Sequence, residues 1–107
     1  MMIKATFKKS NGLFIEYEVT GHAYFAESGK DIVCAGVSTL FITITNQLLC
    51  KSYVKLHDKQ VSILNPNEID NALVGALLCG LYDIQQKYPE NLTVEVIEDV
   101  HTSIEVV

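Results

Sequence analysis

The amino-acid sequence predicts an α/β fold, more closely an α+β two-layer sandwich in which two helices cover one face of a mainly antiparallel or mixed sheet. Three observations support this prediction: segments in which apolar and polar residues alternate, two segments with a helical period, and their order along the chain, ββαβ(β)αβ. A chain of 107 residues allows one domain and hardly more, so residues 1–107 are expected to form a single domain.

Two strands are predicted near the N-terminus. Apolar and polar residues alternate over 3–8 and again over 13–20, as in strands that bury one face. The pair Asn11-Gly12 between them suits the positive φ angles of a tight turn, so the two strands should be antiparallel neighbours. Phe14 falls on the nominally polar face of the second strand. An aromatic side chain there indicates a surface that another subunit covers, which favours a homodimer.

Two helices are predicted from the period of the apolar residues. The first spans about residues 33–51, because one face carries apolar residues four, three and four positions apart: Val37, Phe41, Ile44 and Leu48. The second begins at Asn65-Pro66, a capping residue followed by a proline that suits the first helical position. Pro89 ends it.

Shorter β-favourable segments complete the predicted order. Segments 53–56 and 60–64 flank a polar turn at His57-Asp58-Lys59. They form either a second hairpin or one bent strand, and the sequence does not separate these options. Residues 92–96 return to a period of two and predict the final strand.

The composition excludes some classes of function. The formal net charge is −5, and the eight basic residues are all lysines. Nucleic-acid-binding domains usually present a basic surface with arginines, so direct nucleic-acid binding is set aside. The uncharged stretch 32–50 contains many Ser, Thr, Asn and Gln side chains, which argues against a membrane-spanning helix and for a buried helix of a soluble protein.

The spacing of the cysteines and of His57 and His101 indicates neither a disulfide framework nor a metal site. Three cysteines at long spacings, without a Cys-x-x-Cys pair or a secretory leader, favour a reducing cytoplasm. Cys50 and Cys79 lie among Leu, Gly and Ala and are expected in the core. His57 and His101 lack partners at ligand spacing, so no metal and no cofactor are expected.

A histidine and a cysteine mark the two ends of the segment that links the second predicted strand to the first predicted helix. His22 follows the second strand, and Cys34 falls in the first turn of the predicted helix, so a loop folding back over the sheet edge brings them together. The positive end of a helix and a nearby imidazolium both stabilise a thiolate. Unpaired N–H groups at Cys34 and its neighbours would also donate to an oxyanion. The same spacing also fits a surface histidine and a buried cysteine.

Other residues of this segment each allow two interpretations. Asp31 is either the helix N-cap, accepting from the backbone N–H of Cys34, or a carboxylate that orients the histidine. Ser38 lies one turn after Cys34 and either lines the site or bonds back to a helix carbonyl. Gly21 and Gly29 suit a strand exit and a loop hinge, or ordinary turns. Gly21, Gly29 and Ser38 are the candidate substrate-binding residues.

The segment Gly21-His22-Ala23, followed by Gly29 and then by 31–38 (Asp-Ile-Val-Cys-Ala-Gly-Val-Ser), resembles the signature of the Prp family, the bacterial ribosomal-processing cysteine proteases. The match has no departure at the signature positions. The chain length and the small α/β layout also agree with that family.

The resemblance implies a cysteine endopeptidase that removes a short N-terminal extension from large-subunit ribosomal protein number twenty-seven, cutting after a hydrophobic, Phe-containing stretch. The family nucleophile corresponds to Cys34, and its general base and acid corresponds to His22. The resemblance also implies a homodimer and a mobile loop over 23–33 that must move to admit substrate.

Two other functions compete with this interpretation. A non-catalytic module that binds a ribosomal protein during assembly would keep Cys34 buried and slow to alkylate. A thioesterase or acyl transferase would use the same Cys/His dyad on a small acyl substrate and would leave peptides uncut.

Overall fold

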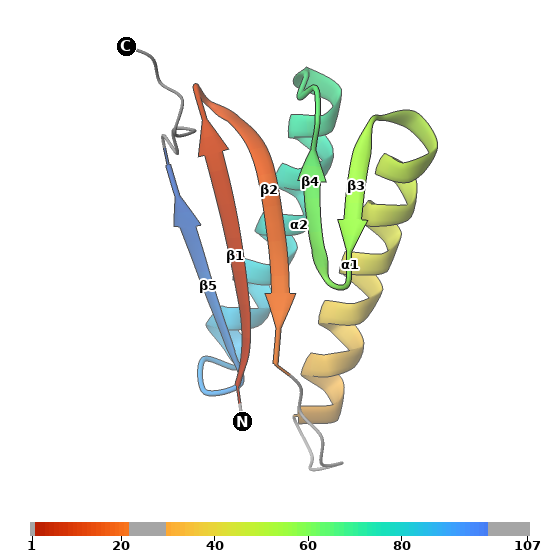
Figure 1. The fold of residues 1–107 in the computed structure, drawn as a ribbon. Coiled ribbons are helices and arrows are strands. Elements are labelled where there is room, and N and C mark those ends of the chain that lie inside the picture. Colours follow the sequence, from red (N-terminus) through yellow and green to blue (C-terminus); the bar gives the residue numbers. More distant parts are fainter. Residues whose placement is uncertain (1, 22–29, 99–107) are drawn as a thin grey trace.

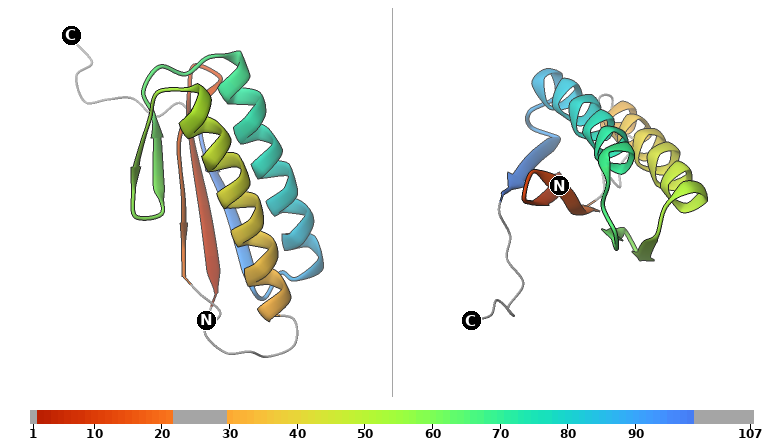
Figure 2. Two further views of the ribbon diagram at one scale, coloured as in Figure 1. Left: turned by 90° about the vertical axis from the view of Figure 1, so that its right-hand side faces the viewer. Right: turned by 90° about the horizontal axis from the view of Figure 1, so that it is seen from above.

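The computed structural model describes residues 2–21 and 30–98, with side chains described from Ile32 onward in the second range. Its elements are β1 (Ile3–Ser10), β2 (Leu13–Thr20), α1 (Lys30–Lys51), β3 (Val54–His57), β4 (Gln60–Ile63), α2 (Glu68–Lys87) and β5 (Leu92–Ile97). The five strands form one mixed sheet in the order β3-β4-β2-β1-β5, with only the β1–β5 pair parallel. Both helices cover the same face of this sheet (Figures 1 and 2). The predicted α+β two-layer sandwich is confirmed, and 53–56 and 60–64 form a hairpin rather than one bent strand.

The first hairpin forms as its turn residues predict. Asn11 and Gly12 have φ angles of 52° and 81°, the conformation for which this pair was singled out. Pairing then runs from Ser10↔Leu13 to Lys4↔Thr20.

A β-bulge in this hairpin changes the predicted face of Phe14. Lys8 pairs with Glu16 but Lys9 pairs with Phe14, so Ile15 is an extra residue in β2. The extra residue reverses the alternation, and Phe14 is buried with its ring edge-on to Phe7. The prediction that Phe14 lies on the polar face was therefore wrong, and Phe14 no longer supports a homodimer.

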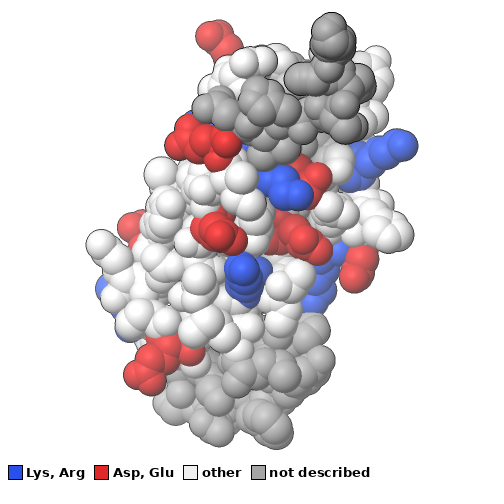
Figure 3. All heavy atoms as spheres, turned by 60° about the vertical axis from the view of Figure 1, so that its left-hand side comes forward, with Lys and Arg blue, Asp and Glu red and all other residues white. Residues whose placement is uncertain are grey.

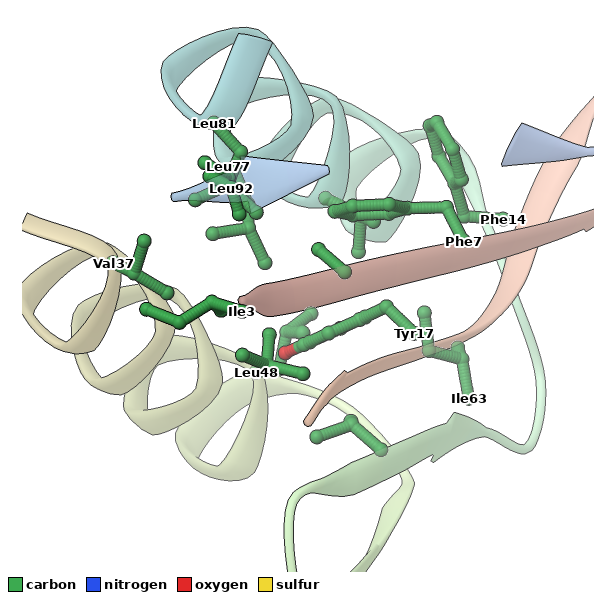
Figure 4. Packing of buried hydrophobic residues seen from close by; sticks show 14 of the residues in the cluster. Ile3, Phe7, Phe14, Tyr17, Val37, Leu48, Ile63, Leu77, Leu81 and Leu92 are labelled. Carbon is green, nitrogen blue, oxygen red and sulfur yellow. The ribbon is translucent and has the colours of Figure 1, made fainter. Parts of the chain in front are cut away.

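The core lies between the sheet and the two helices (Figure 4). Helix α2 contributes Val74, Leu77 and Leu81, each fully buried. The Tyr17 ring stacks on Phe7, and its hydroxyl shares a 2.8 Å hydrogen bond with Thr45 Oγ1 of α1. Burial raises the pKa of Tyr17 to about 12, an effect that this hydrogen bond partly offsets.

The second helix begins later than predicted. The N-cap is Asn67 rather than Asn65, since Asn67 Oδ1 accepts from the Asp70 backbone N–H at 2.9 Å. The segment holds two asparagines, and Asn67 is the one with extended backbone next to the helix. At the other end α2 stops at Lys87, just before Pro89, as predicted.

Helix α1 begins earlier than predicted, at Lys30 instead of Val33. It packs on the sheet and on α2 through a buried stripe that includes Val33, Val37 and Leu48. By length and composition, 32–51 is also long and apolar enough to cross a membrane, a test that core helices of soluble proteins pass as well.

The sheet face opposite the helices carries charged and polar side chains. Lys4 pairs with Glu95 at 3.5 Å, and Lys8 pairs with Glu16 at 3.3 Å. Figure 3 shows lysines and acidic residues interspersed on this side of the molecule. Cross-strand pairs of opposite charge suit a solvent-facing sheet.

Candidate functional site

A pocket of about 200 Å³ is lined by residues near the end of β2, in the N-terminal part and middle of α1 and in the turn between β3 and β4. Figure 1 shows the end of β2 and the start of α1 at the bottom of the molecule, with the β3–β4 turn above them. Most of its wall is apolar and comes from β1, β2 and α1. The apolar lining residues are Ile3, Val19, Val37, Phe41 and Ile42. The remaining lining residues are Gly21, Cys34, Ser38 and Lys59.

Gly21 brings the end of β2 close to the start of β1. Its φ angle is +86°, and a Cβ at this position would overlap the carbonyl oxygen of Met2. An L side chain is therefore excluded by conformation and by space. This glycine sets the path by which the chain leaves β2 at the pocket.

Cys34 forms part of the pocket wall from the N-terminal part of α1. It is half-buried and is the fifth residue of the helix. In a helix that begins at Lys30, the unpaired N–H groups belong to the first residues, and the N–H of Cys34 bonds within the helix. The expectation that the Cys34 N–H is free to donate to an oxyanion was therefore wrong. The sulfur still lies near the positive end of the helix.

The early start of α1 also decides one of the two interpretations of Asp31. Asp31 is the second residue of the helix, so the N-cap interpretation was wrong. Its side chain lies outside the described residues, and a role in orienting the histidine stays a prediction.

Ser38 lines the pocket one helical turn beyond Cys34. Among the described residues its hydroxyl makes no hydrogen bond, while the neighbouring Thr39 bonds back to the Ala35 carbonyl at 2.8 Å. Position therefore favours the site-lining interpretation of Ser38 over the back-bond. A substrate-binding role stays a prediction.

His22 and Gly29 lie outside the described residues, so the predicted contact between His22 and Cys34 stays a prediction. The described chain reaches the pocket at Gly21, the residue directly before His22.

The other cysteines are not core residues as predicted. Cys50 and Cys79 are both exposed, on the outer faces of α1 and α2. The apolar neighbours in their sequence were misleading, because neighbours one or two positions apart point to other faces of a helix. Within the described parts of the chain no three His, Cys, Asp or Glu gather as metal ligands would.

Sequence reasoning missed Lys59 as a pocket residue. It belongs to the turn between β3 and β4, 25 positions after Cys34. No local pattern pairs these two positions; only the placement of β4 beside β2 does so.

Comparison with known proteins agrees with the fold and shows the family. The model of the family described as cysteine protease Prp matches residues 2–93. The ribosomal processing cysteine protease Prp of Bacillus subtilis (strain 168) is 31% identical over 107 residues, covering 87% of this chain and 96% of that protein.

Two solved structures share the fold. The SMU.848 protein of Streptococcus mutans is 33% identical, with a TM-score of 0.80 over 91% of this chain and 95% of that chain. The ribosomal processing protease Prp of S. aureus, solved with a substrate peptide, is 21% identical, with a TM-score of 0.76 over 89% of this chain and 99% of that chain. The family match spans most of the chain, and the chain therefore belongs to the Prp family of cysteine proteases and is a cysteine peptidase.

Proposed function

We propose that this protein is an endopeptidase that removes the N-terminal extension of large-subunit ribosomal protein number twenty-seven, with Cys34 as nucleophile and His22 as general base and acid. The observation that carries the proposal is the position of Cys34 in the wall of a mostly apolar pocket that Gly21, the neighbour of His22, also lines. The name of the B. subtilis relative supports a ribosomal substrate. An acidic chain, with a net charge of −5, also suits a basic ribosomal protein tail.

The proposed reaction follows the general chemistry of a thiol–imidazole pair. His22 takes the proton of Cys34, and the thiolate attacks the scissile carbonyl to form a tetrahedral intermediate. His22 then gives the proton to the leaving amine, and the C–N bond breaks to leave a thioester on Cys34. Water, activated by the same imidazole, hydrolyses the thioester and restores the thiol.

The size and lining of the pocket support a peptide substrate with a large apolar side chain near the scissile bond. An apolar cavity of about 150 Å³ in another protein accommodates benzene. The volume here, about 200 Å³, therefore suits one aromatic or branched side chain. Val37 and Phe41 would contact that side chain from the same helix that carries the nucleophile.

The test is mass spectrometry of a synthetic peptide that spans the ribosomal protein's extension and its mature start. The wild-type protein is expected to make a single cut, and Cys34→Ala none. Cys79→Ala, which changes an exposed cysteine of α2, is the matched control and should cut like the wild type. If wild type binds the peptide without cutting it, the protease assignment for this substrate fails.

Homodimer formation and a cytoplasmic location stay predictions. Sedimentation equilibrium would test the first: a mass of twice 11.9 kDa is expected, and a mass of 11.9 kDa at assay concentrations would contradict it.

A further inference from the structure

Among the described residues that line the pocket, Lys59 is the charged one. It belongs to the turn of the β3–β4 hairpin, whereas Cys34 lines the pocket from α1. Its side chain is half-buried, whereas Lys55, His57 and Asp58 of the same hairpin are exposed. Of the charged residues of this hairpin, Lys59 is the one that lines the pocket.

The backbone of Lys59 is held in place by β2. The Val19 N–H donates to the Lys59 carbonyl oxygen at 3.2 Å. The next residue, Gln60, donates from its side chain to Glu16 at 2.7 Å and pairs with Glu18 in the sheet. With its main chain fixed on both sides, the Lys59 side chain extends from a defined point at the pocket rim.

The electrostatic setting favours an anion beside Lys59. The two ion pairs among the described residues use Lys4 and Lys8, on the polar face of the sheet. The net charge of −5 works against anion binding by the chain as a whole, so a carboxylate in the pocket requires a local cation. Among the described residues that line this mostly apolar pocket, Lys59 supplies that cation.

We propose that Lys59 binds the carboxylate that peptide cleavage creates in this pocket. The inference rests on the proposed function, because Cys34 must first form the thioester. Water adds its oxygen to the thioester carbonyl carbon, the C–S bond breaks, and one proton returns to the sulfur. The new carboxylic acid releases its remaining proton to solvent at neutral pH. The carboxylate therefore arises beside the sulfur of Cys34, in the pocket that Lys59 lines.

The consequence is that the N-terminal product binds through its charged end and inhibits the enzyme. The experiment compares two forms of the fragment released in the cleavage assay, one ending in a free carboxylate and one ending in an amide. Isothermal titration calorimetry measures the affinity of each form for the wild-type protein. The carboxylate form is expected to bind about three- to tenfold more tightly, as for a partly exposed charge-assisted hydrogen bond.

Variants of Lys59 test whether its charge causes the tighter binding of the carboxylate form. Lys59→Gln should bind both forms equally, and Lys59→Arg should keep the preference for the carboxylate. Lys55→Gln removes an exposed lysine of the same hairpin and should behave like wild type. An undiminished preference in Lys59→Gln, or equal binding of both forms by the wild type, would overturn the proposal while leaving the protease function intact.

Two further outcomes are distinguishable. Absence of any cut by the wild type would overturn both proposals, because no carboxylate would then form. A fall of kcat in Lys59→Gln with an unchanged carboxylate preference would assign Lys59 to the tetrahedral intermediate and overturn product binding.

Discussion

The two helices cover the same sheet but serve different purposes. Helix α2 buries Val74, Leu77 and Leu81 completely, and Asn67 caps its first turn. Helix α1 also buries a stripe, yet Cys34 and Ser38 line the pocket and Ile42 is 55% exposed. The apolar residues of α2 thus serve mainly the core, whereas those of α1 are divided between the core and the pocket.

The contrast extends to the contact between the helices. Gly36 of α1 faces Ile84, and Gly80 of α2 faces Leu40 so closely that a Cβ would come within 2.8 Å of that side chain. Small residues on both helices therefore let them approach each other. This contact holds the N-terminal half of α1, and with it Cys34, on a rigid support.

The largest expected effect tests the structural role of α2. Leu77→Ala should destabilise the protein by about 2–5 kcal/mol, since it leaves a cavity at a fully buried position. Leu49→Ala, at a 47% exposed position of α1, should cost far less. Urea unfolding followed by circular dichroism measures both. Equal losses would show that the outer face of α1 is as tightly packed as the core.

The next effect concerns Tyr17, which joins the sheet to α1. Its folded pKa, about 12, lies above the ordinary 10.0, so its contribution to stability is complete below pH 10 and is lost as the pH rises toward 12. The loss should be on the order of 2–3 kcal/mol. Comparing the free energy of unfolding of the wild type and of Tyr17→Phe from pH 9 to 12 isolates this loss. Parallel pH profiles of the two proteins would contradict the prediction.

The smallest expected effect is a difference in reaction rate between the cysteines of the two helices. Cys34 is half-buried while Cys50 and Cys79 are exposed, so accessibility alone makes Cys34 the slowest to react. If His22 and the start of α1 activate the Cys34 thiol, it should instead react with iodoacetamide at least about tenfold faster. Peptide mapping at neutral pH gives each rate. A slow Cys34 would favour the non-catalytic binding module.

Sequence patterns predicted the parts of the fold that local chemistry determines. The strands, the Asn11-Gly12 turn and the helical period follow from local chemistry and were predicted. Phe14 was misplaced because a bulge adds one residue, and no local pattern signals that register shift.

Within the site, Cys34 was found from its residue type and its position near a helix start. The start itself was placed three residues late, which misassigned Asp31 and the N–H of Cys34. Lys59 was missed because its distance from Cys34 along the chain is bridged only by the pairing of β4 with β2.

The parallel pairing of β1 with β5 also governs when the pocket can form. Ile3, part of the pocket wall, pairs with Leu92. One of the first residues of the sheet therefore gains this strand partner only when the last strand is present. Contacts so distant along the chain slow folding and are made last during synthesis. We therefore expect the pocket wall at Ile3 to be completed only once β5 has left the ribosome, so that a nascent chain lacking β5 carries the nucleophile without a finished site.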